Sequence, residues 1–273
     1  MRRLFSDFVL LIALLLTSFT VSAMKKFPAT DFFSGPQLVL AQAIERGDAA
    51  KVKQLARATD LNTPGRKNMT LLFFAFQEAL ERDPKQLEIM GVLVKAGADP
   101  RQPVRNLGSV LGVAMDSSQP DFLRVLLDAG LDPNTMIGGR RPILFFVTLN
   151  STFDSLKLLI ARGADLNRRD SLRNTPLYEA LMSGAFDQIN YLLDHGANPN
   201  TYNINGVSFP LALSDDIETN ADAPESITYK KLVEIRDRLI KMGVKWPPES
   251  PEQLRARWGD AEGRVDDSKH PLR

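Results

Sequence analysis

Basic side chains gather in four short stretches of this 273-residue chain, residues 64–69, 100–108, 134–142 and 167–174. If charge were spread evenly, these 32 residues would hold about four bases and about four acids. They hold nine bases and a single acid, Asp170. Eight of the nine are arginines, whose planar guanidinium forms paired hydrogen bonds with carboxylates. The nine are Arg66, Lys67, Arg101, Arg105, Arg140, Arg141, Arg168, Arg169 and Arg173.

Two interpretations of these bases remain open. They can form a surface that docks an acidic protein partner, which is the interpretation favoured here. The alternative is a set of solvated arginines without any partner, since surface loops are often charged. The formal net charge of +1 argues against strong non-specific nucleic-acid binding, which needs many uncompensated bases.

Groups that could perform catalysis are few. The absence of cysteine excludes disulfides, thiolate metal sites and a thiol nucleophile. Of the two histidines, His195 stands at a predicted helix end, where a structural role is expected, and His270 lies in a polar tail. Asp215 and Asp216 are adjacent carboxylates, but Ser214–Ser226 has five acids and no base and is predicted to be a solvated loop without raised pKa values. Phosphate-loop, nucleophile-elbow and metal-cluster motifs are missing, so the sequence predicts a non-enzymatic protein with no cofactor and no metal.

The elements that carry these bases recur along the chain. Gly97, Gly130, Gly163 and Gly196 follow one another at intervals of 33 residues. Several other columns keep the same step, among them Leu111, Leu144 and Leu177, and Asn134, Asn167 and Asn200. So many columns with one period indicate a repeat architecture.

One repeat can be interpreted physically. Thr175 is a good helix N-cap, and Pro176 fits the first helical turn that follows it. Gly184 ends this first helix, and a second helix then runs to Gly196. Each unit is a helical hairpin with an extended loop, too small to bury its own apolar face. Stacking of neighbouring units buries that face, which predicts a solenoid.

These residues resemble the ankyrin-repeat family. Thr175-Pro176-Leu177 and Ala180 match its T-P-L-H-x-A pattern, with Tyr178 in place of the usual histidine. The resemblance spans residues 36–245 and implies an all-α ankyrin-repeat solenoid of about six stacked helical hairpins with short extended loop tips. Insertions are expected near residues 77–88 and 214–228.

The resemblance also implies where binding occurs. In ankyrin proteins the loop tips and the first helices form a concave recognition surface, so the nine bases should line up as one stripe. The rings of Phe73, Phe74, Phe145 and Phe146 fall on first helices. We expect most of them in the core, with the concave wall beside the arginines as the alternative.

The two ends of the chain differ from the repeats. Residues 1–23 have Arg2 and Arg3, then an apolar run, then Val21-Ser22-Ala23, which predicts a cleaved signal peptide. The 14 residues from Phe8 to Val21 are too few for a spanning helix, which favours export to the periplasm without stable membrane insertion. A start at Met24 would instead make the protein cytosolic.

Two further segments flank the repeats. Residues 24–35 form a lead-in, and residues 246–273 form a polar C-terminal tail. Within the tail, Glu252 to Trp258 is predicted to form one or two helical turns that cover the last repeat, with Trp246 and Trp258 as contacts.

The predicted function is protein binding. The combination of a signal peptide, no lipid-anchoring cysteine and a repeat stack with insertions resembles exported bacterial ankyrin proteins that are encoded beside toxic secreted effectors such as phospholipases. This resemblance implies a periplasmic immunity protein that occludes its cognate toxin. The alternative is an envelope scaffold or chaperone-like adaptor for a resident periplasmic protein. A third, weaker hypothesis is direct binding of the bases to an anionic envelope surface.

Overall fold

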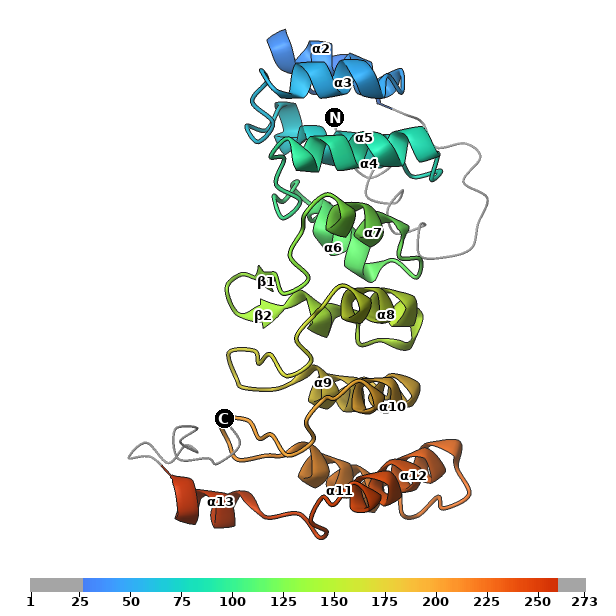
Figure 1. Cartoon of the computed structure of the whole chain (residues 1–273), viewed down its shortest axis with the longest axis vertical. Helices are drawn as coiled ribbons and strands as arrows, with labels where there is room; N and C mark the ends of the chain where they lie inside the picture. Colours follow the sequence, from blue (N-terminus) through green and yellow to red (C-terminus); the bar gives the residue numbers. More distant parts are fainter. Residues whose placement is uncertain (1–26, 260–273) are drawn as a thin grey trace. The chain divides into compact units, whose positions relative to one another are not determined.

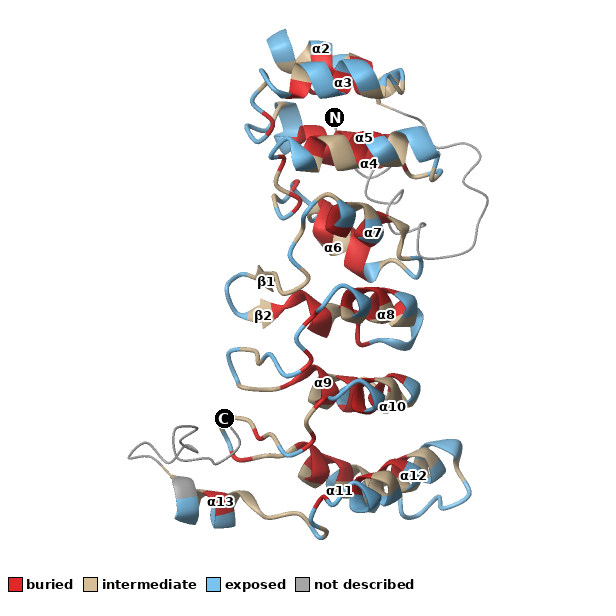
Figure 2. Cartoon of the chain, in the orientation of Figure 1, coloured by how far each residue is buried: buried red, intermediate tan, exposed pale blue. Residues whose placement is uncertain are grey.

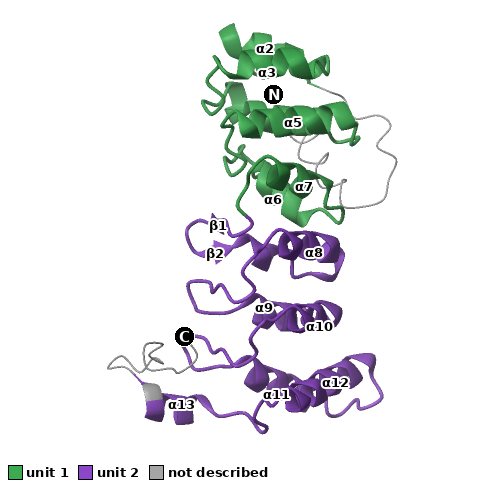
Figure 3. Cartoon of the chain, in the orientation of Figure 1, with its two compact units in different colours: residues 1–132 green, residues 133–273 purple. Residues whose placement is uncertain are grey.

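The computed structural model describes residues 27–259, which form two compact units divided between Asp132 and Pro133 (Figure 3). The predicted signal peptide, His270 and half of the polar tail lie outside the described residues. Each unit contains three helical pairs, each followed by a loop (Figure 1). The prediction of six helical hairpins is confirmed.

Unit 1 opens with a short 3-10 turn and then has three α-helical pairs. The pairs pack first helix against second, and the second helices α3, α5 and α7 also pack on one another. Its elements are η2 (Ala29–Asp31), α2 (Gly35–Glu45), α3 (Ala49–Ala56), η3 (Arg66–Asn68), α4 (Leu71–Glu78), α5 (Pro84–Lys95), α6 (Val110–Asp116) and α7 (Asp121–Asp128).

Unit 2 repeats this plan with one irregular pair. Its elements are β1 (Met136–Ile137), β2 (Arg141–Pro142), η4 (Ile143–Val147), η5 (Asn150–Thr152), α8 (Phe153–Ala161), α9 (Pro176–Met182), α10 (Phe186–Asp194), α11 (Phe209–Thr219), α12 (Ile227–Lys241) and α13 (Pro251–Trp258). In both units, apolar side chains are buried where the helices of a pair face each other (Figure 2).

Hydroxyl N-caps start four of the first helices, whereas Ser34 before α2 makes no such bond. Thr70, Ser109, Thr175 and Ser208 each accept a hydrogen bond from the backbone N–H three residues ahead, at 3.1, 3.1, 3.4 and 3.2 Å respectively. Such a bond satisfies one of the backbone donors that a helix N-terminus leaves unpaired.

The fourth repeat departs from this rule. Pro142 stands at the cap position and offers no side-chain acceptor, and the segment after it is the 3-10 helix η4 rather than an α-helix. The prediction of an α-helical first helix was therefore wrong here. A second 3-10 turn, η5, then leads into α8.

Glycines end the second helices as expected. Gly97, Gly130, Gly163 and Gly196 have φ of +104°, +107°, +85° and +93°, a left-handed conformation that side chains with a Cβ disfavour. The chain therefore turns out of each helix at the same point of the repeat.

Asparagines then join consecutive repeats. Asn62, Asn134 and Asn167 stand eight residues before their cap positions. The Oδ1 atom of each accepts a backbone N–H from the next repeat, that of Asp99, Asp165 or Asn198, at 2.9, 2.7 and 2.8 Å. The Nδ2 atoms of the same residues donate to the carbonyls of Gly97, Gly163 and Gly196.

The two insertions are largely helical. The first extends the end of α4 and the start of α5, leaving only residues 79–83 between them. In the second, α11 continues to Thr219, so the solvated loop predicted from Ser214 begins only at Asn220. Ser208 caps α11, and α12 packs along it, which keeps the polar stretch helical.

The predicted C-terminal helix is present as α13. Leu254 of α13 is 5% exposed and packs on Tyr202, a residue of the last loop tip. Trp246 is half-buried, and the Trp258 side chain lies outside the described part. Leu254 therefore makes the described contact of α13, and the contact expected of Trp258 stays a prediction.

The lead-in also belongs to the core. Phe32 and Phe33 are buried, and their ring centres lie 6.1 and 5.5 Å from that of Phe74. Within residues 27–259, no helix combines the length and the apolar character needed to cross a bilayer.

Candidate protein-interaction surface

The loop tips of unit 2 are joined in a row by hydrogen bonds. The Ser171 N–H donates to the carbonyl of Arg140 at 3.0 Å, and the Ile204 N–H donates to that of Leu172 at 3.1 Å. Arg255 of α13 closes the row by donating from Nη1 to the carbonyl of Asn205 at 3.0 Å. The loops are therefore fixed with respect to one another.

The first loop of the row is a small hairpin. Strands β1 and β2 pair antiparallel, and Gly138 and Gly139 at its tip both have positive φ, +58° and +67°. Two consecutive left-handed residues suit the type of turn that matches the twist of the strands. The turn exposes Arg140 directly after it.

Three predicted bases carry unpaired guanidinium groups. Arg140 and Arg168 lie on neighbouring loops of unit 2, and Arg105 lies on a loop of unit 1. All three are exposed, and among residues 27–259 none forms a side-chain hydrogen bond or ion pair. Leu172, 52% exposed, lies in the loop of Arg168.

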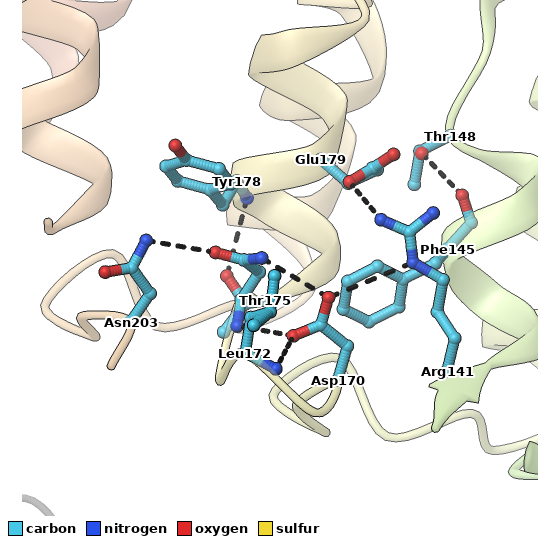
Figure 4. Close-up of polar contacts among 10 residues, drawn as sticks. Arg141, Phe145, Thr148, Asp170, Leu172, Thr175, Tyr178, Glu179 and Asn203 are labelled. Carbon is cyan, nitrogen blue, oxygen red and sulfur yellow. Dashed lines mark hydrogen bonds and ion pairs between the residues drawn. The ribbon is translucent and has the colours of Figure 1, made fainter. Parts of the chain in front are cut away.

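Arg141 has an internal role instead. Its Nη2 lies 3.0 Å from Oε2 of Glu179, and its Nε lies 3.9 Å from Oδ2 of Asp170 (Figure 4). The guanidinium carbon is 5.4 Å from the ring centre of Phe145 and 5.9 Å from that of Phe146. The charge of Arg141 is therefore already balanced by two carboxylates.

Three bases of unit 1 are also engaged within the chain. The guanidinium of Arg66 donates to the carbonyls of Asp31 and Thr30. Lys67 Nζ lies 5.3 Å from the ring centre of Phe32, and Arg101 is paired with Asp99.

Arg169 and Arg173 are half-buried and each has an intramolecular interaction. Of the nine predicted bases, the described residues thus leave one guanidinium unpaired in unit 1 and two in unit 2, and the others are engaged within the chain.

The phenylalanines on the first helices are core residues, as the favoured interpretation expected. Phe73, Phe74 and Phe145 are at most 3% exposed. Phe146 is half-buried below the guanidinium of Arg141, so one ring of the four does reach the wall beside an arginine.

Acidic side chains lie on α9 and α11, two neighbouring first helices of unit 2. Burial, followed by the charge of Asp215, raises the pKa of Asp216 above its ordinary value. Burial together with the charges of Asp216, Glu179 and Asp215 raises the pKa of the Tyr178 phenol. The prediction of full solvation was therefore wrong for Asp216, because α11 packs against α9, whereas Asp215 is exposed as expected.

Two exposed apolar residues were missed by sequence reasoning. Leu149 and Met182 are 47% and 50% exposed. They stand 33 residues apart, and Asp215 follows at the same interval, so these three occupy one column of the repeat. The period contained this signal, but a leucine or methionine in a helix is more often a core residue.

The described residues offer little for catalysis. His195 stacks on Tyr191, with ring centres 4.0 Å apart, and its Nδ1 lies 2.8 Å from the carbonyl of Tyr191. This fits the structural role expected for it. Between Phe27 and Gly259, no group of three or more histidine or acidic side chains is placed to hold a metal ion.

Comparison with known proteins agrees with this architecture. The family described as ankyrin repeats (3 copies) matches residues 111–203. The ankyrin-repeat domain of Bcl-3, described as a member of the IkappaB protein family, superposes with a TM-score of 0.59 at 23% identity, covering 80% of this chain and 90% of that one.

A second similar structure is an ankyrin-repeat domain from Acinetobacter baumannii, with a TM-score of 0.54 at 22% identity, covering 76% of this chain and 98% of that one. No curated protein matches the sequence. Ankyrin repeats mediate binding to protein partners, and their fold is generally non-enzymatic. Residues 111–203 therefore match ankyrin repeats, and the chain has the fold of an ankyrin-repeat solenoid.

Proposed function

We propose that this chain is an exported immunity protein that binds a cognate secreted toxin, for example a phospholipase, and occludes its active site. The observation that carries the binding part is the pair of unpaired cations Arg140 and Arg168 on neighbouring loops of unit 2. A guanidinium with no internal partner loses no existing ion pair when an acidic partner docks. Export rests on the sequence of residues 1–23.

Rigid loops favour this mode of binding. The bonds from Ser171 to Arg140 and from Ile204 to Leu172 hold the loops before any partner arrives, which lowers the entropy lost on association. The internal ion pairs of Arg141 add to this order. A protein that blocks an active site by occlusion needs such a fixed surface and no cofactor.

The binding test is a charge reversal that spares Arg141. Arg140→Glu/Arg168→Glu should weaken binding to the acidic partner at least about a hundredfold, since two attractive contacts become repulsive. Arg124→Glu/Lys241→Glu, with the same charge change on second helices, should bind as wild type. Equal affinity of all three proteins would show that these loops are not the interface.

The immunity role has its own test. The gene should stand beside a toxin gene, and its deletion should make cells sensitive to their siblings in mixed culture. A neighbour that is not a toxin, together with unchanged survival, would favour the envelope scaffold or adaptor instead.

A further inference from the structure

At or just after the ends of the first-helix segments η4 and α9, unit 2 has an apolar row of two side chains that no other described part of the unit covers. Leu149 and Met182 occupy equivalent positions of consecutive repeats and are each about half exposed. Leu172, on the loop between them in sequence, is 52% exposed. Large apolar side chains exposed at equivalent positions of consecutive repeats are typical of an interface centre.

The same row ends in uncompensated negative charge. Asp215 takes the next position after Met182, and Asp216 follows it on α11. Neither carboxylate has an ion pair within the part of the chain that the structure describes. Glu179, by contrast, is neutralised by Arg141. Within unit 2, the unpaired acids of this column therefore lie at the α11 end of the apolar row.

Tyr178 completes this end of the row. It lies on α9, which packs against α11, and the charges of Asp215 and Asp216 both act on its phenol. A tyrosine on the helix that packs beside two carboxylates suits a cationic side chain, because a ring face attracts cations and carboxylates accept their hydrogen bonds. Tyr178, Asp215 and Asp216 are referred to below as the acidic wall.

Building on the proposed function, we infer that the protein partner inserts a segment with apolar side chains on Leu149 and Met182 and a lysine or arginine against the acidic wall. The partner is then acidic where it meets Arg140 and Arg168 and basic where it meets α11. Charge of both signs on one partner fixes the direction in which the segment lies across the repeats. An all-acidic partner would be repelled by Asp215 and Asp216.

The test uses three fluorescein-labelled peptides and the chain from residue 24 onward. One peptide alternates leucine and arginine, the second replaces leucine by serine, and the third replaces arginine by glutamate. Fluorescence anisotropy should show that the leucine–arginine peptide binds most tightly. Asp215→Asn/Asp216→Asn should weaken that binding about tenfold or more, since the peptide loses charge-assisted hydrogen bonds.

Matched variants separate the contribution of the two carboxylates from that of the apolar side chains. Asp222→Asn/Glu225→Gln removes two charges from the loop after α11 and should leave the affinity unchanged. Met182→Ser should weaken binding of the leucine–arginine peptide and leave binding of the serine–arginine peptide unchanged. Equal weakening by both acidic double variants, or no difference between the leucine and serine peptides, overturns the inference.

The peptide test can fail or succeed separately from the test of the loop arginines. Arg140→Glu/Arg168→Glu should bind the leucine–arginine peptide at least as well as wild type, although it should lose the acidic partner. If that variant keeps its partner while the acidic-wall variant does not bind the peptide, the proposed role of the loop arginines fails and the acidic wall stands.

Discussion

Arg101 is hydrogen-bonded to Asp99 of its own repeat, with Nε 2.9 Å from Oδ1 and Nη2 3.2 Å from Oδ2. Burial opposes ionisation of Asp99, but the hydrogen bonds and charge of Arg101 outweigh it and keep the pKa of Asp99 below its ordinary value. At the equivalent position Asn62, Asn134 and Asn167 bridge to the next repeat. Arg101 thus exchanges a link between repeats for a contact within one.

Replacing Arg101 by asparagine should stabilise unit 1. The new amide can donate to the carbonyl of Gly130 as Asn62 donates to that of Gly97, and a typical hydrogen bond contributes about 1 kcal/mol. The exposed Arg101–Asp99 pair that is lost contributes less than about 1 kcal/mol. Urea unfolding measures the net gain, and Arg105→Asn on the same loop should show none. A destabilised Arg101→Asn protein would contradict the bridging role.

Arg140 and Arg141 are adjacent in sequence but should respond differently to truncation. Arg141→Ala leaves Asp170, whose side chain is 6% exposed, and Glu179 without their cation, so we expect a loss of about 1–3 kcal/mol. Arg140→Ala should change stability by less than about 0.5 kcal/mol, because its side chain has no internal partner. Similar melting temperatures for the two variants would refute the structural role of Arg141.

Thr175→Ala should cost about 1 kcal/mol of unfolding free energy. The substitution removes the acceptor that pairs with the Tyr178 N–H at the start of α9. Ser171→Ala, in the loop before it, removes a hydroxyl without a helix cap and serves as the control. Equal unfolding midpoints for the two variants would show that the cap contributes nothing.

Asp216→Asn should stabilise the protein at neutral pH and not in acid. The pKa of Asp216 is raised in the folded state, so its protonated form favours folding, and that stability is lost as pH rises through the folded pKa. An amide mimics the protonated form. Because the group is partly solvated, the gain at pH 7 should stay below about 1 kcal/mol and vanish below the unfolded pKa of 3.8. Thermal scans across this pH range measure it, with Asp222→Asn as the control.

Leu254→Ala should release α13 from the last loop of unit 2. Leu254 and Tyr202 form a small buried cluster of their own, and loss of a buried leucine costs about 2 kcal/mol or more. Hydrogen exchange should therefore quicken in residues 251–258 and in the loop around Tyr202. The helices α9 and α10 should keep their protection, and Ile227→Ala, at a position 79% exposed, should change neither region. Unchanged exchange in α13 would show that other contacts hold it.

Much of the fold could be predicted from the sequence because its determinants are local. Thr175 and Ser208 mark helix starts through their own hydroxyls, and Gly97 and Gly196 mark helix ends through their own backbone freedom. The period of 33 residues then implies stacking, since one hairpin cannot bury its apolar face. Burial of Phe73 and Phe145 followed from the same periodicity.

Less of the candidate site could be predicted from the sequence, because the pairing of a side chain depends on which residues of the neighbouring repeat lie opposite it. Sequence alone identified the arginines of the loops, but tertiary structure decided that Arg141 meets Glu179, 38 residues away, while Arg140 meets solvent. The same holds for Asp216, whose pKa changes because α11 packs on α9, and for Met182, exposed where its type suggests a core. Local chemistry thus determined the helices and turns of this protein, and long-range packing determined which of its charges are free to bind.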